Sequence, residues 1–299
     1  MSIASVIIVN FNSGSILHEC VQRVLCSTVS VEIFIADNGS TDNSIALVKS
    51  EFKNLSNLHI IEIGSNLGFS TANNIALKLT SGDYIVFINP DCLIEKNTLE
   101  QMILAASEYP NVGMAGCLIL NMDGTEQSGC RRAIPTPIRS LFRVFRLQHF
   151  FPNIPFFQDF NLTGTPLPLK PICVDAISGA FMLVKRSALD IVGPLDSKYF
   201  LHCEDLDWCM RFTQAGLSIL FVPHVVITHI KGSCSIQRPI FVEWHKHRGM
   251  VRFYQKFFLT NYPRPLYWLI KSAIWMRFLA LVVYYSFGHI ARYFGIKHG

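Results

Sequence analysis

The sequence is poor in charged residues and has no paired cysteine motif. Asp, Glu, Lys and Arg make up only 16% of its 299 residues, while 50% are hydrophobic. This composition is apolar for a soluble protein, so a role at a membrane has to be considered. The nine cysteines form no Cys-x-x-Cys pair, so the sequence implies neither a zinc site nor a disulfide framework. We expect the cysteines to be reduced thiols, as in an ordinary cytosolic protein.

Two targeting features are also missing from the ends of the chain. Residues Met1 to Asn10 contain no basic segment and no cleavage site, so they are interpreted as a first strand, not a signal peptide, and the body of the protein is expected in the cytoplasm. Near the other end, the longest uncharged run extends little beyond Phe278 to Phe287. A membrane-spanning helix needs about 20 apolar residues, so amphipathic helices are favoured over a spanning hairpin.

Apolar runs alternate with helical patterns in the first part of the chain. Strands are predicted at residues 5–9, 31–36 and 59–63 and in the centre of 83–91, and helices at 15–27, up to 51, around 73–74 and at 97–108. This alternation predicts an α/β fold with a mostly parallel sheet and helices on both faces.

Polar residues follow each of these four strands. Asn10, Asp37, Gly68 and Asp91 stand at or just after the predicted carboxyl ends, which meet along one edge of a parallel sheet. Each alone is compatible with an ordinary turn. Together they favour a nucleotide site at that edge.

The chain between 112 and 185 contains two further predicted strands and an irregular segment. Strands are expected at 112–120 and 174–185, with a hairpin-like turn at 121–124 and with Gly179 allowing a backbone or ligand to approach closely. Residues 131–171 are rich in Pro, Phe and Arg with little periodicity. They are interpreted either as a flexible loop near an amphipathic acceptor or as a variable insertion without a binding role.

A second concentration of polar residues begins at Glu204. As a helix start, it places Glu204 and Asp205 in the first turn, where the helix dipole favours negative charge, and pairs Asp207 with Arg211. Packing does not account for Asp205, which is therefore a candidate general base. His229 follows another apolar strand and is either structural or a neutral imidazole beside a metal.

The last 60 residues have a helical pattern with apolar and basic positions. Helices are predicted from Phe241 and over 266–294, and Lys and Arg gather after Arg131 and again after Arg238, which suits phosphates or anionic lipid head groups. The helices are expected on a membrane surface, or packed on the rest of the chain or a dimer partner.

Seven motifs in order carry a resemblance to a known family. They are Val-Ile-Ile-Val-Asn10-Phe-Asn, Asp37-Asn-Gly-Ser-Thr-Asp42, Asn66-Leu-Gly-Phe69 with Asn73, Asn89-Pro-Asp91, Ser178-Gly-Ala-Phe181, Glu204-Asp-Leu-Asp-Trp-Cys-Met-Arg211 and His229-x-x-Gly232. The sequence resembles the family 2 inverting glycosyltransferases of GT-A fold over roughly residues 3–255. It is most similar to the bacterial rhamnosyltransferase-type members that build lipopolysaccharide O-antigen and other surface polysaccharides.

The resemblance implies a role for each motif residue. Asp205 corresponds to the catalytic base, Asp91 and His229 to the site of a divalent metal (Mg²⁺ or Mn²⁺), and Asp37 to a contact with the nucleobase or ribose. Further donor-binding residues are expected to be Asn10, Asn38, Gly68, Asn73, Asn89 and Gly179; acceptor contact or support is expected from Glu204, Trp208 and Arg211. Asn89 replaces the first acid of the family's metal motif, and the usual aromatic residue before Glu204 is displaced.

The resulting expectation is a metal-dependent glycosyltransferase at the cytoplasmic face of the inner membrane, attached peripherally. Residues 1–238 would form the catalytic GT-A domain and 239–299 a membrane-associating helical region. The donor would be a dTDP- or UDP-sugar, such as dTDP-rhamnose, and the acceptor a lipid-linked saccharide; a homodimer is possible and no nucleic acid is involved. One alternative function is a sugar nucleotidyltransferase, which would need a Gly-rich phosphate loop with Arg or Lys that Asn10–Gly14 lacks. Another is a non-catalytic nucleotide-sugar-binding subunit, and Asn89 is the only residue that favours it.

Overall fold

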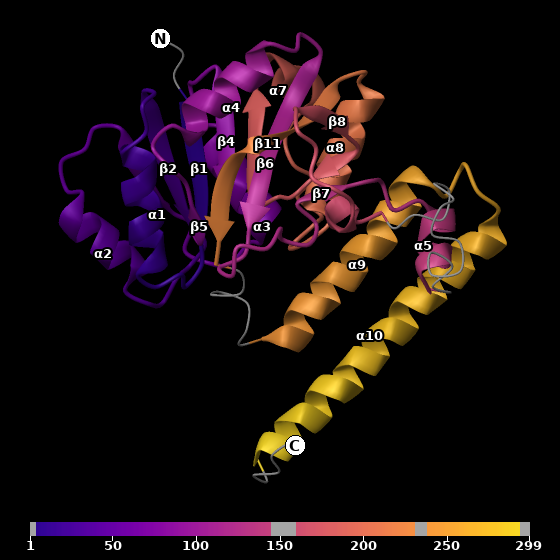
Figure 1. Cartoon of the computed structure of the whole chain (residues 1–299). Helices are drawn as coiled ribbons and strands as arrows, with labels where there is room; N and C mark the ends of the chain where they lie inside the picture. The colour runs from indigo at the N-terminus through magenta and orange to yellow at the C-terminus, as the bar shows by residue number, and fades with distance from the viewer. Residues whose placement is uncertain (1–3, 145–159, 231–237, 294–299) are drawn as a thin grey trace. The chain divides into compact units, whose positions relative to one another are not determined.

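A sheet of nine strands forms the centre of the structure (Figure 1). The structure is a computed structural model, and it describes residues 4–144, 160–230 and 238–293. The strand order of the sheet within these residues is β3-β2-β1-β4-β10-β6-β11-β5, and β8 pairs with β11. The strands are β1 (Ala4–Asn10), β2 (Val31–Asp37), β3 (Leu58–Glu62), β4 (Tyr84–Ile88), β5 (Cys92–Leu93), β6 (Val112–Leu120), β8 (Ile172–Val174), β10 (Phe181–Lys185) and β11 (Ser218–His229).

Most strands of the sheet point in one direction. β1 pairs in parallel with β2 and β4, β2 with β3, and β6 with β11, while β10 lies antiparallel between β4 and β6. All seven residues of β1 are buried, as expected for a strand covered on both faces. The predicted α/β fold with a mostly parallel sheet is confirmed.

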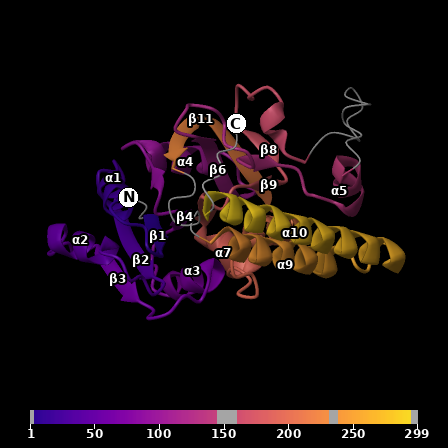
Figure 2. The ribbon, with the colours of Figure 1, turned by 90° about the horizontal axis from the view of Figure 1, so that it is seen from below.

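Helices cover both faces of the sheet. On one face, α1 (Ile16–Leu25), α2 (Ser44–Glu51) and α4 (Thr98–Ser107) share a buried cluster with Val6 and Ile8 of β1. On the other face lie α3 (Phe69–Leu77), α7 (Arg186–Val192) and α8 (Glu204–Gln214), as Figure 2 shows for α3 and α7. The ring of Phe87 in β4 meets Trp208 of α8 edge-on at 5.0 Å. Alternate residues of each strand thus serve the two faces.

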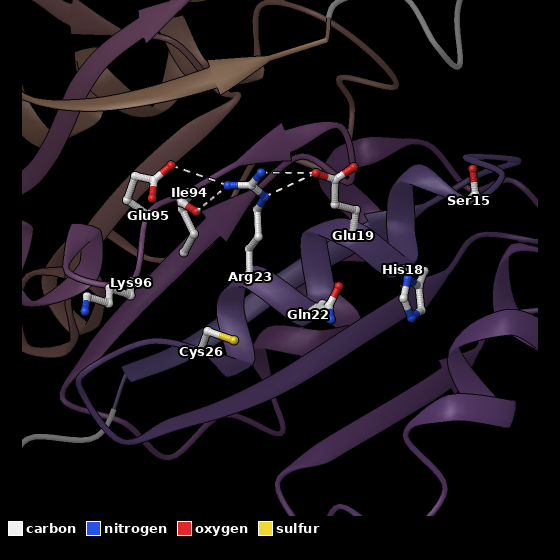
Figure 3. Close-up of a pocket in the computed structure, with 9 residues that line it drawn as sticks. All are labelled: Ser15, His18, Glu19, Gln22, Arg23, Cys26, Ile94, Glu95 and Lys96. Carbon is white, nitrogen blue, oxygen red and sulfur yellow. Dashed lines mark hydrogen bonds and ion pairs between the residues drawn. The ribbon is translucent and has the colours of Figure 1, made fainter.

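A surface pocket lies beside α1 (Figure 3). Its lining residues are Ser15, His18, Glu19, Gln22, Arg23, Cys26, Ile94, Glu95 and Lys96. Within it, Arg23 pairs with Glu19 at 3.2 Å and with Glu95 at 3.4 Å. None of the residues expected to bind donor, metal or acceptor lines this pocket.

The segment predicted to be irregular contains short regular elements where it is described. β7 (Arg131–Arg132) pairs with β9 (Ala176–Ile177), and the segment also holds α5 (Pro137–Val144) and the 3₁₀ turn η2 (Leu162–Gly164). The prediction of little structure was therefore wrong for these residues, because the pairing partner of β7 lies more than 40 residues later. Residues 145–159, which include the Phe-rich part, lie outside the described residues.

The chain divides into two compact units. Unit 1 comprises residues 1–134, 159–200 and 204–234, and unit 2 comprises 135–158, 201–203 and 235–299. Unit 2 contains α5 and two long helices, α9 (Pro239–Phe257) and α10 (Arg264–Tyr293), which lie side by side (Figures 1 and 2). The expected boundary at residue 238, between a catalytic domain and a C-terminal helical region, stays a prediction.

Aromatic rings join α9 to α10 in unit 2. The ring of Trp244 lies 5.1 Å from that of Trp275 and 5.5 Å from that of Phe278. Unit 2 also includes the turn Leu201–Cys203, in which His202 and Cys203 have φ angles of 68° and 69°. A Cβ on Gly249 of α9 would lie 2.9 Å from the carbonyl oxygen of His202, so the close packing of this turn on α9 depends on glycine.

The other side of α10 exposes apolar side chains. Ile270, Ile274 and Phe278 are buried at four-residue spacing, whereas several other large apolar side chains are exposed: Trp268, Leu269, Met276, Leu279 and Val283. Among the described helices, Arg264–Ser286 is long and apolar enough to cross a membrane by length and composition. This is weak support, since core helices of soluble proteins meet the same criterion.

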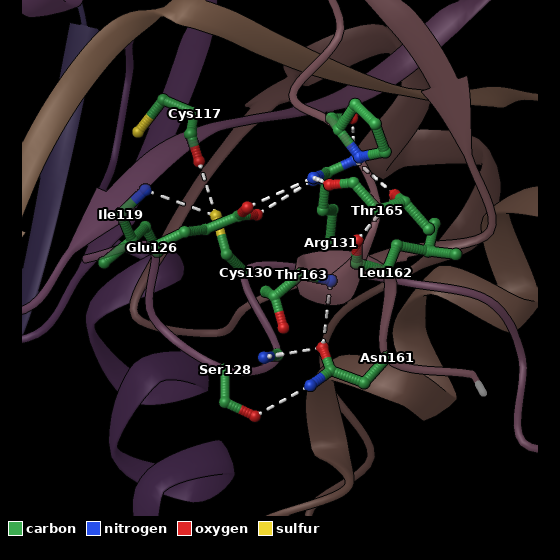
Figure 4. Close-up of polar contacts among 12 residues, drawn as sticks. Cys117, Ile119, Glu126, Ser128, Cys130, Arg131, Asn161, Leu162, Thr163 and Thr165 are labelled. Atoms are coloured by element: carbon green, nitrogen blue, oxygen red, sulfur yellow. Dashed lines mark hydrogen bonds and ion pairs between the residues drawn. The ribbon is translucent and has the colours of Figure 1, made fainter. Parts of the chain in front are cut away.

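A buried arginine ties β7 to the turn η2 (Figure 4). Arg131 is 2% exposed and donates to both carboxylate oxygens of Glu126, at 2.8 and 3.1 Å. It also donates to the carbonyl oxygen of Thr165 at 2.8 Å, and its guanidinium lies 5.7 Å from the ring centre of Phe221. The bidentate geometry and the added acceptor satisfy a charge that burial alone would make costly.

We expect Arg131→Met to destabilise unit 1 strongly, because it leaves the Glu126 carboxylate, whose side chain is only 16% exposed, without its partner. Breaking one side of such a pair costs about 3–5 kcal/mol in the free energy of unfolding. Urea unfolding monitored by circular dichroism measures it. Arg23→Met removes a partly exposed pair and should cost no more than about 1 kcal/mol. Equal midpoints for the two variants would contradict this account.

Candidate active site

The carboxyl ends of β1 and β2 meet through side chains. Asn10 and Asp37 are register partners, and Asn10 Nδ2 donates to Asp37 Oδ1 and to Ser44 Oγ, each at 2.9 Å. The backbone N–H of Asn38 donates to the carbonyl of Asn10 at 2.8 Å. The structure therefore brings these predicted donor-binding residues together at one edge.

The turn before α3 is attached to this edge by Asn38. Asn38 Nδ2 donates to Asn66 Oδ1 and its Oδ1 accepts from the N–H of Leu67, both at 2.9 Å. Gly68 has φ +86°, and a Cβ there would lie 2.6 Å from the carbonyl oxygen of Phe200. Only glycine fits both conditions. Asn73 is 1% exposed and donates to the carbonyl of Phe69 at 2.9 Å, a bond within its own helix.

The turn after β4 places Asp91 next to His229. The carbonyl of Asn89 accepts from the N–H of Cys92 at 3.1 Å, which closes the turn. Asp91 Oδ1 then lies 3.0 Å from His229 Nε2, and both side chains are buried. The backbone holds the two together, because the N–H of Ile230 donates to the carbonyl of Asp91 at 2.9 Å.

Gln127, which the sequence did not suggest, contacts the other side of the imidazole. His229 Nδ1 lies 2.6 Å from Gln127 Oε1, and Gln127 is 5% exposed. Its Nε2 donates to Asn121 Oδ1 at 3.0 Å. No local pattern marks Gln127, because its partner is 102 residues later in the chain.

The donor atoms at Asp91 and His229 fit a divalent cation. A carboxylate oxygen and an imidazole nitrogen face each other. The carboxylate suits Mg²⁺ or Mn²⁺, whereas the imidazole favours a transition metal such as Mn²⁺ over Mg²⁺. The thiol of Cys92 lies within 4.8 Å of both groups. Cys92 is fully buried in the apolar core, however, and burial raises the pKa of its thiol well above the usual value. A thiolate is a soft ligand that suits Zn²⁺ or Cu⁺ better than Mg²⁺ or Mn²⁺, so Cys92 is not assigned to the set.

Asp205 is held between Arg132 and Gly179. Its Oδ2 accepts from Arg132 Nη2 at 2.5 Å and from the N–H of Gly179 at 3.1 Å. A Cβ on Gly179 would lie 3.3 Å from the Asp205 Cβ, so the glycine in the interrupted strand gives the carboxylate room. Arg132 was not predicted, because 73 residues separate it from Asp205.

Neighbouring carboxyl groups on α8 have pKa values shifted in opposite directions. Burial alone would raise the pKa of Asp205, but the charge and hydrogen bond of Arg132 outweigh it and hold this pKa below its usual value. Burial, and then the negative charge of Asp205, raise the pKa of Glu204 to about 8. At neutral pH Asp205 is therefore ionised and Glu204 is largely protonated, a separation typical of acid and base roles.

The other expected acceptor-side residues anchor α8. Trp208 is fully buried and its Nε1 donates to the carbonyl of Gly193 at 2.9 Å. Arg211 pairs with Asp207 at 2.9 Å and donates to the carbonyl of Val192 at 3.0 Å. Trp208 and Arg211 therefore attach α8 to the end of α7, and their expected roles in acceptor contact or support stay predictions.

Comparison with known proteins gives matches over most of the chain. The family model described as glycosyl transferase family 2 matches residues 5–170. An N-acetylglucosaminyl-diphospho-decaprenol L-rhamnosyltransferase of Mycobacterium tuberculosis is 26% identical over 284 residues, covering 91% of this chain and 90% of that protein. The rhamnosyltransferase WbbL of Escherichia coli is 26% identical over 227 residues, covering 73% of this chain and 80% of that protein.

A solved structure has the same fold. The mannosyltransferase PcManGT of Pyrobaculum calidifontis, in complex with GDP-Man and Mn²⁺, aligns with a TM-score of 0.59 at 17% identity. The alignment covers 90% of this chain and 68% of that protein.

Proposed function

Because the chain belongs to glycosyl transferase family 2, we propose that it is an inverting enzyme that transfers rhamnose from dTDP-rhamnose to a lipid-linked saccharide in O-antigen-type polysaccharide synthesis. The names of two similar proteins, both rhamnosyltransferases, support the donor sugar. One of those names contains a diphospho-decaprenol acceptor, which supports the lipid carrier. The observation that carries the reaction is Asp205 at the entrance of α8, a partly buried carboxylate whose pKa Arg132 holds below its usual value.

The edge formed by β1, β2 and β4 is the proposed donor site. Asp37 and Asn38 would contact the nucleoside, and Asn89, next to Asp91, would face the diphosphate. A divalent cation held by Asp91 and His229 would balance the negative charge of the leaving nucleoside diphosphate. The Mn²⁺ in the structure with the same fold supports the choice of cation.

Asp205 is the proposed general base. Arg132 keeps its carboxylate ionised, so the carboxylate is ready to take the proton of the attacking acceptor hydroxyl. The oxygen of that hydroxyl bonds to the anomeric carbon as the bond to the diphosphate breaks on the opposite side. One displacement inverts the configuration, and no residue becomes covalently attached to the sugar.

The charge of the C-terminal part supports peripheral attachment to the cytoplasmic face of the inner membrane. After Glu243 the sequence has no Asp or Glu and nine basic residues: Lys246, Arg248, Arg252, Lys256, Arg264, Lys271, Arg277, Arg292 and Lys297. Exposed apolar side chains of α10, among them Trp268 and Leu279, accompany these charges. Apolar residues with basic neighbours suit an anionic bilayer surface. The homodimer remains a prediction.

Replacing Asp205 tests the proposed reaction directly. Asp205→Asn keeps the shape but removes the base, so transfer from dTDP-rhamnose to a prenyl-diphosphate-linked saccharide should fall by about 10²–10⁴-fold. Calorimetric binding of dTDP in the presence of Mn²⁺ should not change. Asp190→Asn, on the exposed surface of α7, is the matched control and should retain wild-type transfer. Full turnover in Asp205→Asn would refute the base assignment.

Replacing Arg132 should shift the pH dependence of the reaction. Asp205 acts as a base only when ionised, and Arg132 lowers its pKa. In Arg132→Met, only the backbone N–H groups of Leu206 and Gly179 still oppose burial, so the pKa of Asp205 rises and the acidic limb of the kcat/KM profile moves to higher pH. Arg132→Lys should shift it less.

Two further variants test whether the acidic limb of the kcat/KM profile reports the ionisation of Asp205. The charged and titratable groups interacting with Asp205 are Arg132, Glu204 and Cys209, and Asp207 acts on Glu204. A limb that stays in place in Glu204→Gln belongs to Asp205. Arg23→Met, remote from the site, should keep the wild-type profile. An unshifted acidic limb in Arg132→Met would remove the role given to Arg132.

Vesicle co-sedimentation tests the membrane proposal. The protein should bind phosphatidylglycerol vesicles, bind neutral phosphatidylcholine vesicles much less, and be released by high salt. Neutralising Arg264, Lys271 and Arg277 to Gln should weaken binding about 100-fold, at about 1 kcal/mol per charge. The matched control neutralises Lys49, Lys53 and Lys78 of unit 1. Retention at high salt would indicate a spanning helix and overturn peripheral attachment.

A further inference from the structure

A chain of side-chain hydrogen bonds connects the turn after β6 to His229. Asp123 Oδ1 accepts from Thr125 Oγ1 at 2.6 Å, and Thr125 Oγ1 accepts from Asn121 Nδ2 at 2.9 Å. Asn121 Oδ1 then accepts from Gln127 Nε2 at 3.0 Å, and Gln127 Oε1 lies 2.6 Å from His229 Nδ1. We call these four bonds the Asp123 relay.

The direction of every bond in the Asp123 relay is set by its first member. An ionised carboxylate only accepts hydrogen bonds, so the hydroxyl of Thr125 must donate to Asp123 and offer its lone pair to Asn121. The amide of Asn121 is thereby oriented with its oxygen toward Gln127. The bonds from Thr125 lower the pKa of Asp123, which keeps it in the accepting form.

The relay ends by selecting one form of the imidazole. Because the oxygen of Gln127 faces His229, Nδ1 of that ring must carry a hydrogen, and in the neutral ring Nε2 then presents its lone pair toward Asp91 Oδ1, 3.0 Å away. Two acceptor atoms 3.0 Å apart have the separation of neighbouring ligands of one small cation, which would lie to one side of the pair and contact both. A metal-ligating histidine characteristically donates its other N–H in this way.

Backbone hydrogen bonds also hold the turn of the relay, beside the bond that the N–H of Thr125 donates to Asp123 Oδ1 at 3.0 Å. The N–H of Asn121 donates to the carbonyl of Thr125 at 2.9 Å, and the N–H of Gln127 to the carbonyl of Ile119 at 2.8 Å. His229 is the register partner of Cys92 in the sheet. Changing one relay side chain therefore changes the orientation of the next without removing the turn.

We propose that Gln127, oriented by the Asp123 relay, is a positioning residue that holds His229 in the Nδ1–H form and so directs its Nε2 to a divalent cation at Asp91. This rests on the cation site of the proposed function. Without Gln127 the ring takes the other tautomer, and Nε2–H donates to Asp91. In that bond Nε2 of His229 and Oδ1 of Asp91 are paired with each other and are not available to a cation.

The first measurement reads the tautomer without any metal. Two-bond ¹H–¹⁵N spectra of ¹⁵N-histidine-labelled protein, recorded above the ordinary pKa of histidine, should show His229 as the Nδ1–H form; His229→Gln identifies its signals. In Gln127→Met the signals should change to the Nε2–H form. Gln127→Glu keeps an accepting oxygen and should retain the Nδ1–H form. An unchanged tautomer in Gln127→Met overturns the inference.

The second measurement is Mn²⁺ binding in the presence of dTDP, followed by electron paramagnetic resonance of the free ion. Gln127→Met should weaken binding about 10–100-fold, the usual effect of losing such a partner, while Gln127→Glu should not. Thr125→Val interrupts the relay without touching His229 and should weaken binding less. Met122→Ala, in the same turn and 69% exposed, is the matched control and should bind as the wild type does.

The outcomes separate this inference from the proposed cation site. Asp91→Ala should abolish Mn²⁺ binding; if it does not, or if the wild type binds no Mn²⁺, the cation site is refuted while the tautomer spectra still decide the role of Gln127. If the wild type binds Mn²⁺ and Gln127→Met binds it equally well, the positioning role is overturned.

Discussion

The parallel register of β1 with β2 and β4 determines where the polar residues of the site lie. Asn10 is paired with Asp37, and Ile8 with Ile88, so the three strands end at nearly the same level. Backbone hydrogen bonds and a core buried on both faces hold this register, because a shift by one residue would turn each side chain to the opposite face. The position of the proposed donor site is thus a consequence of the sheet.

Pairs of residues that are distant in the sequence complete the site. Asp91 and His229 are 138 residues apart, and Arg132 and Asp205 are 73 apart. In each pair the local fold supplies the position of one partner and burial strengthens their interaction. The opposite protonation states of Glu204 and Asp205 also follow from burial, since a single nearby guanidinium decides which of the two keeps its charge.

The sequence predicted what local patterns encode. Apolar runs located the parallel strands, and Asn10 and Asp37, two of the residues that follow them, meet at one edge. The antiparallel position of β10 between β4 and β6 was not predictable, since apolar content does not specify the partner of a strand. Arg132 and Gln127 were missed for the same reason, because only the folded chain brings their partners near. β7, α5 and η2 were not predicted, because the Arg-rich and Pro-rich composition of residues 131–171 has little strand or helix periodicity.

The turn Leu201–Cys203 limits how far the two units are separate modules. Cys203 belongs to unit 2 and the next residue, Glu204, begins α8 in unit 1. His202 and Cys203 both adopt left-handed φ angles, which cost about 1–3 kcal/mol each unless the surroundings impose them. Gly249 supplies part of those surroundings from α9, although glycine within a helix is itself unfavourable by up to about 1 kcal/mol. A chimaera that exchanged only residues 239–299 between relatives would place a foreign helix against this turn. The C-terminal helices and the entrance of α8 are therefore expected to be inherited together.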